Sequence, residues 1–133
     1  MKIAFEALGF GKGDNFGGSA IVSSRNAEEL AARGHEVVYF CTNKKDKTST
    51  LYNDTTIVNI NGVKVIYLKT YMIPLWRGSF GPFIIPKMKK YLDDEGSFDI
   101  IHLNDQRLFL AIFTSKWAIK DNITFTIHSH SDT

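Results

Sequence analysis

Apolar and polar positions follow one another along the chain in blocks that predict strands and helices in turn. Residues 3–8 and 37–41 are apolar runs, typical of strands covered on both faces. Between them, residues 19–33 carry mostly small apolar side chains near one face, which predicts a helix packed closely on a sheet, with Gly34 as its stop. Strand, helix and strand in this order predict a βαβ unit with a right-handed crossover.

The later blocks continue this alternation with one interruption. Residues 56–60 and 63–68 are β-rich runs separated by Asn61-Gly62, a dipeptide that strongly signals a hairpin. Both runs, or the second alone, are expected to join the main sheet. Residues 70–86 are rich in aromatic residues without a regular pattern, which indicates a functional loop. The chain then predicts a helix over 87–95, a strand over 99–103, an apolar helix over 107–119 and a strand over 123–127.

This order of elements predicts an α/β fold. We expect a Rossmann-like, open, twisted and mostly parallel sheet with helices on both faces and a β-hairpin excursion around residues 56–68. The 133 residues predict a single domain over residues 1–133. In such sheets ligands bind at the carboxyl ends of the strands. The glycine-rich stretch of residues 9–19, the residues after the strand over 99–103, and the segment from His128 should share that edge.

Composition narrows the class of protein. A formal net charge of +2 is too small to predict nucleic-acid binding. The single cysteine, Cys41, lies in an apolar run, so no internal disulfide forms and a reducing compartment is expected. Met1 and Lys2 lead straight into the first strand, which predicts no signal peptide, and no apolar run approaches the roughly 18 residues that span a bilayer. We therefore expect a cytoplasmic protein.

The glycine stretch carries five glycines between the first strand and the first helix. Glycine reaches positive φ at no steric cost and lets a ligand approach the backbone. A helix that starts at Gly18 and Ser19 directs unpaired N–H groups and a positive dipole end at an anion. We therefore expect Gly17, Gly18 and Ser19 to bind a phosphate-like group, with a purely structural turn as the alternative.

The surrounding residues exclude two common phosphate-binding classes. A dinucleotide site needs an acidic residue at the end of the second strand, where Thr42, Asn43 and Lys44 stand instead. A P-loop needs Lys-Ser/Thr after its last glycine, and here Ser19 and Ala20 follow Gly18. NAD binding and P-loop triphosphatase activity are therefore not expected.

Histidines follow the last predicted strand. We expect His128 and His130 to line the cleft at this strand end. The H-x-H-x-D pattern that they form with Asp132 leaves a metal-dependent hydrolase fragment as an alternative.

Polar residues also end the strand over 99–103. His102 lies within the strand, and its direction depends on the register. Asn104 and Asp105 come directly after it and should face the same cleft. Asp105 can serve as the N-cap of the next helix or contact a substrate.

Several stretches, taken together, resemble the N-terminal domain of the retaining glycosyltransferases of family four, which have the GT-B fold. Residues 16–20 (FGGSA) resemble the family's Gly-Gly loop, 30–37 (LAARGHEV) its "L-A-x-R-G-H-E-V" turn, 61–65 (NGVKV) its "G-V-x-V" strand, 98–104 (FDIIHLN) its "F-D-(V/I)-(V/I)-H-x-H" strand and 126–129 (TIHS) its "T-x-H-(G/D/S)" strand end.

The resemblance implies one half of a two-domain enzyme. This half binds a sugar or lipid-linked acceptor, and a missing C-terminal domain or partner subunit holds most of the nucleotide-sugar donor. In the family, the Gly-Gly loop approaches the donor diphosphate, and the histidine that matches His128 lies in the catalytic cleft near the transferred sugar. Asn104 stands where the family has the second histidine of H-x-H. The resemblance requires neither a metal nor a cofactor beyond the nucleotide-sugar substrate.

The expected function is therefore transfer of a sugar to an acceptor hydroxyl with retention of configuration, with this chain inactive alone. The alternative is a non-catalytic Rossmann-like module that binds an anion or a partner, with the helix over 107–119 as partner surface. Residues 72–91 combine aromatic and basic side chains. They predict packing over the acceptor pocket or, alternatively, peripheral contact with anionic headgroups at the inner face of the membrane.

Overall fold

The computed structural model describes residues 1–7, 9–11, 18–43, 50–72, 83–84, 88–96, 98–103 and 124–127. The helix predicted over 107–119 and most of the aromatic stretch over 70–86 lie outside the described residues.

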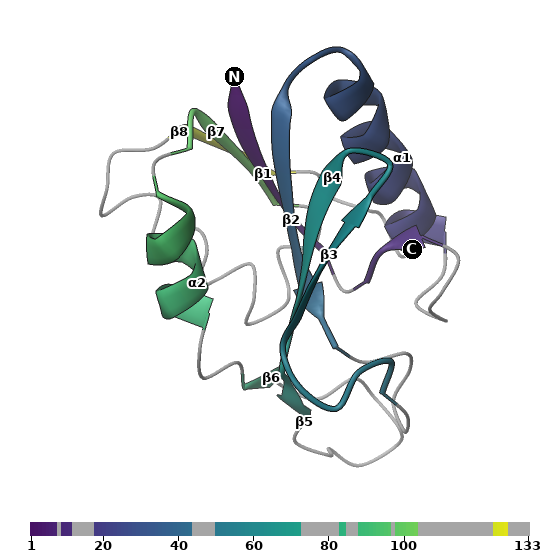
Figure 1. Cartoon of the computed structure of the whole chain (residues 1–133), viewed down its shortest axis with the longest axis vertical. Helices are drawn as coiled ribbons and strands as arrows, with labels where there is room; N and C mark the ends of the chain where they lie inside the picture. Colours follow the sequence, from purple (N-terminus) through teal and green to yellow (C-terminus); the bar gives the residue numbers. More distant parts are fainter. Residues whose placement is uncertain are drawn as a thin grey trace.

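Within the described residues, six strands form one sheet in the order β3-β4-β2-β1-β7-β8 (Figure 1). β3 and β4 pair antiparallel, and the other neighbours in this sheet pair parallel. A second, two-stranded antiparallel pair consists of β5 and β6. The elements are β1 (Lys2–Glu6), α1 (Gly18–Ala32), β2 (Glu36–Thr42), β3 (Thr56–Ile60), β4 (Val63–Leu68), β5 (Tyr71–Met72), β6 (Phe83–Ile84), α2 (Met88–Glu95), β7 (Ile100–Leu103) and β8 (Thr124–Ile127).

Helices α1 and α2 cover opposite faces of the sheet. On one face, Ile3 and Phe5 of β1 belong to a buried cluster with Ala27 of α1. On the other face, Ala4 of β1 and Leu92 of α2 belong to a second buried cluster. Adjacent residues of β1 thus belong to different cores, because successive side chains point to opposite faces of the sheet. The predicted α/β fold, with a mostly parallel sheet and helices on both faces, is confirmed.

The helix α1 ends where the glycine signal predicted. Gly34 has a φ of +93°, a backbone conformation that glycine adopts without strain. Its N–H donates to the carbonyl oxygen of Ala31 over 3.1 Å, and the N–H of His35 donates to Leu30 over 3.2 Å. These bonds satisfy carbonyl groups that the end of a helix leaves open.

The hairpin predicted at Asn61 and Gly62 is present, and both of its strands join the main sheet. Asn61 has a φ of 51° and Gly62 a φ of 86°, as a two-residue turn of the primed type requires. The side-chain amide of Asn61 also donates to Glu28 Oε2 on α1 over 2.8 Å. The hairpin is therefore fastened to the helix at its turn.

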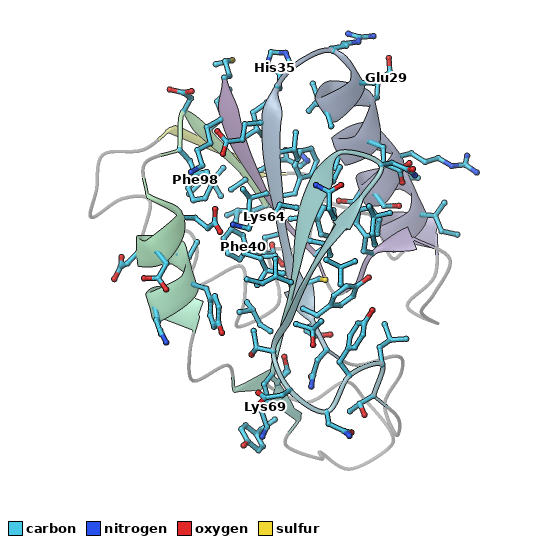
Figure 2. The ribbon with its side chains drawn as sticks, in the orientation of Figure 1. Glu29, His35, Phe40, Lys64, Lys69 and Phe98 are labelled. Atoms are coloured by element: carbon cyan, nitrogen blue, oxygen red, sulfur yellow. The ribbon has the colours of Figure 1, made fainter. Side chains whose placement is uncertain are left out.

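An ion-pair group holds the end of α2 against the sheet. The carboxylate of Glu95 contacts the ammonium groups of Lys2 on β1 and Lys64 on β4. The ring of Phe98 lies 5.2 Å from Lys2 Nζ and packs edge-on against Phe40. Figure 2 shows Phe40, Lys64 and Phe98 between the sheet and α2. Charge pairing and ring packing thus fix the position of α2 together.

Candidate functional site

The parallel strands bring their carboxyl ends to one edge of the sheet. β1, β2, β4, β7 and β8 all run in the same direction, and they end at Glu6, Thr42, Leu68, Leu103 and Ile127. The glycine stretch follows β1 at this edge, and α1 starts there (Figure 1). This is the edge at which open α/β sheets bind ligands.

The beginning of the glycine stretch is held by β2 and α1. The hydroxyl of Tyr39 donates to the carbonyl oxygen of Gly9 over 2.8 Å. The ring of Phe10 meets the Tyr39 ring at 4.8 Å and 87°. Gly11 has a φ of +69°, and a Cβ at this position would lie 3.7 Å from Ser24 Oγ. A glycine is therefore favoured at position 11 by its backbone conformation rather than by lack of space.

The predicted helix start coincides with the observed one, because α1 begins at Gly18. The first N–H groups of any helix lack partners within it, and its dipole is positive at this end. Gly17 lies outside the described residues. Binding of a diphosphate by Gly17, Gly18 and Ser19 stays a prediction.

His102 lies on the α1 face of the sheet. It pairs in register with Phe5, and the two ring centroids lie 5.2 Å apart. It is half-buried and lines a hollow of about 520 Å³ together with Phe5 and Leu30. The register therefore turns this side chain toward the sheet face beneath α1, one residue before the strand ends. Its contact with an acceptor stays a prediction.

The other predicted site residues lie outside the described residues: Asn104, Asp105, His128 and His130. The strands that precede them are neighbours, with Leu103 of β7 paired to Ile127 of β8. Both strands thus reach the carboxyl edge side by side, and the roles of the residues that follow stay predictions.

One buried carboxyl group at this edge was missed from the sequence. Glu6, the last residue of β1, is fully buried, on the face that also carries Ala4. The available signal was a carboxylate inside an otherwise apolar run, because ionised side chains are rarely buried without a function or a partner.

A polar group at the ends of β2 and β4 was also missed. Asn43 accepts from the N–H of Thr70 over 3.0 Å and donates through its amide to the carbonyl oxygen of Tyr52 over 2.9 Å. The backbone N–H of Asn43 also donates to Leu68 over 2.9 Å. Asn43 and Thr70 are buried, so these bonds fix the chain where both strands leave the sheet.

A second hollow opens between α1 and the β3–β4 hairpin, and we name it the α1 groove. It has a volume of about 420 Å³ and extends from the glycine stretch along the helix. Its lining consists of Phe10, Gly11, Ile21, Ser24, Arg25, Glu28, Ile60 and Tyr67.

The described residues contain neither a metal-binding cluster nor a membrane-spanning helix. No three histidine, cysteine or acidic side chains gather there into a group that could hold a metal ion. Within the same ranges, no helix has the length and apolar character needed to span a bilayer.

The family of the chain follows from comparison with known proteins. A model of the family described as Glycosyltransferase Family 4 matches residues 16–133. The chain belongs to this family. The matched range includes α1 with its glycine-rich start and every later strand of the sheet. The predicted resemblance is therefore confirmed.

The fold of this family-four domain also matches a solved structure. It is similar to sucrose-phosphate synthase from Thermosynechococcus elongatus, with a TM-score of 0.54 and 18% sequence identity. The match covers 95% of this chain and 31% of that chain, so the family-four domain spans about a third of that protein's length. No curated protein matches the chain significantly. At this identity the likeness shows the fold, which is that of a GT-B glycosyltransferase domain.

Proposed function

We propose that this chain is the acceptor-binding half of a retaining glycosyltransferase, which moves a sugar from a nucleotide-sugar to an acceptor hydroxyl. The observation that carries the proposal is the family-four match over residues 16–133. The position of α1 supports it, because the helix begins at Gly18 at the ligand-binding edge of a parallel sheet.

The glycine stretch is the proposed wall of the donor site. Gly17, Gly18 and Ser19 act through backbone N–H groups, which stabilise the negative charge that grows on the departing diphosphate. Tyr39 holds the beginning of the stretch through its bond to Gly9, so this end of the stretch is fixed before the donor arrives. Prearranged dipoles are effective because they need no reorganisation during the reaction.

His128 is the proposed residue that orients the transferred sugar or the acceptor. The neighbouring strand ends of β7 and β8 support a shared acceptor site for His102, Asn104, Asp105 and His130. The transferred sugar keeps its anomeric configuration.

The chain alone is proposed to be inactive. It spans 31% of the matched synthase chain, and a second domain or subunit would supply the rest of the donor site. The test compares this chain with the product of the whole gene that carries it. Both are incubated with a panel of nucleotide-sugars and glycoside acceptors, and NMR follows the anomeric proton of the product.

Transfer with retention by the whole product, and none by the chain alone, is the expected result. His128→Ala in the whole product should lower kcat by about 100-fold, the cost of misplacing a reacting group. Ile57→Ala is the control, because Ile57 on β3 is exposed and lines neither of the two hollows described above. Inversion of configuration, or transfer by the chain alone, would contradict the proposal. Absence of both transfer and nucleotide binding would favour a non-catalytic module.

A further inference from the structure

We infer that the α1 groove binds a neutral sugar ring of the acceptor and that Arg25 and Glu28 select it. The inference rests on the proposed transferase function. It adds the chemical class of the acceptor and names residues outside the motifs that carry the family resemblance.

The position of the groove fits an acceptor. Phe10 and Gly11 line it where the glycine stretch leaves β1, and Glu28 and Ile60 line it beside the hairpin turn. The bond of 2.8 Å between Asn61 and Glu28 joins helix and hairpin at that far end. A ligand in the groove therefore reaches the same loop that the proposed donor diphosphate approaches.

The charges in the groove fit a neutral ligand with hydroxyl groups. One basic side chain, Arg25, and one acidic side chain, Glu28, are present among the lining residues, so their formal charges cancel. Hydroxyl groups both donate and accept hydrogen bonds, and they match a guanidinium and a carboxylate together. An anionic ligand would face the carboxylate of Glu28 as well as the guanidinium.

Both charged groups keep hydrogen-bonding capacity for a ligand. Arg25 is exposed and has no ion pair or hydrogen bond with any described residue. Arg33, directly after the same helix, is instead bonded to Glu29 Oε1 over 3.1 Å. Glu28 accepts from Asn61 through Oε2, and its Oε1 accepts from none of the described groups.

The remaining lining fits the apolar faces of a pyranose ring. Phe10 is held edge-on by Tyr39, and the Tyr67 ring lies 5.0 Å from the Tyr52 ring. Both aromatic residues are buried and therefore held in place. A volume of about 420 Å³ lies within the range of small-molecule sites, roughly 300–1,000 Å³, which combine apolar walls with few polar groups.

The experiment titrates the labelled 133-residue chain with neutral methyl glycosides of glucose, galactose, mannose and N-acetylglucosamine, and NMR follows the backbone amides. At least one glycoside should bind and shift the amides of Ser24, Glu28 and Ile60. Arg25→Gln and Glu28→Gln should each raise its Kd by about tenfold, because each removes a hydrogen bond to a charged group. Arg33→Gln, outside the groove, is the matched control and should leave the Kd unchanged.

Three outcomes would overturn the inference. The first is that no glycoside of the panel binds. The second is that Arg25→Gln and the unchanged chain have equal Kd values for the glycoside. The third is that glucose 6-phosphate or inorganic phosphate binds more tightly than any glycoside, with an affinity that depends on Arg25. Amide spectra of each variant confirm that it is folded. The transfer assay on the whole gene product separates the two proposals. If a glycoside binds in the groove but the whole product transfers no sugar, only the transferase function is contradicted. Transfer with an unchanged acceptor KM in Arg25→Gln contradicts only the groove.

Discussion

Tyr39 and Gly9 are joined by a buried hydrogen bond of 2.8 Å, from the phenol hydroxyl to the backbone carbonyl oxygen. Tyr39 lies in the middle of β2, and Gly9 opens the glycine stretch after β1. Tyr39 also stacks on Phe5, with ring centroids 5.9 Å apart, and meets Phe10 edge-on. One side chain thus connects the second strand, the first strand and the loop that the family resemblance assigns to the donor.

Tyr39→Phe should lower the free energy of unfolding by about 1–3 kcal/mol, because the buried carbonyl group of Gly9 loses its donor. Urea denaturation measures the loss. Tyr71→Phe is the control, since Tyr71 is half exposed and its ring contact with Lys69 survives the change. Equal losses in the two variants would contradict a special role for the Tyr39 hydroxyl.

Gly62→Ala should destabilise the chain by about 1–2 kcal/mol, because an L-residue is strained at a φ of +86°. The added methyl group itself fits, at 3.5 Å from the Cβ of Ala31. Asn61→Gly should cost less, because glycine accepts the turn geometry and only the bond to Glu28 is lost. Thermal unfolding compares the two variants, and a larger loss for Asn61→Gly would be inconsistent with backbone strain.

Glu95→Gln should lower the free energy of unfolding by about 1–2 kcal/mol, between the usual effects of exposed and buried ion pairs. Glu95 contacts Lys2 and Lys64, and its side chain is only 11% exposed. Glu29→Gln is the matched control, because it breaks the exposed pair with Arg33 and should cost no more than about 0.5 kcal/mol. Denaturant titrations at low salt measure both losses. A smaller loss for Glu95→Gln than for Glu29→Gln would refute the proposed importance of the α2 contact.

Ser23→Ala should raise the free energy of unfolding by about 1 kcal/mol. The Ser23 hydroxyl is buried in α1 and has no hydrogen-bond partner in the part of the chain that the structure describes, and alanine is also the better helix former. Ser24→Ala provides the comparison, because Ser24 is also buried but donates to the carbonyl oxygen of Ile21 over 2.9 Å. Calorimetry should find no gain for Ser24→Ala, and a similar gain in both would disprove the explanation.

The fold could be predicted because its signals are local. Asn61 and Gly62 specify a turn through their own backbone preferences, and Gly34 ends a helix for the same reason. The apolar run over β2 required cover on both faces, which the helices on the two faces of a mostly parallel sheet provide. The family resemblance also rests on short stretches, and the match over residues 16–133 confirms it.

The site could be predicted only in outline, because its geometry depends on contacts between distant segments. Pattern alone placed the glycine stretch at the strand ends, but it could not bring Tyr39 to Gly9 or Asn61 to Glu28. The face on which His102 lies depends on its register with Phe5, which no local signal gives. The α1 groove likewise exists only because hairpin and helix pack together.

The central place of β1 has a consequence for synthesis on the ribosome. Lys2 pairs with Glu36 and Ile3 with Ile100, so β1, which is made before both of its neighbours, gains the second one only after β7 has emerged. At a synthesis rate of roughly 5–20 residues per second, one edge of this apolar strand stays unpaired for on the order of several seconds. An unpaired apolar edge is open to wrong pairing with other chains. Nascent chains that stall between β4 and β7 should therefore be the form of this protein that most needs a chaperone.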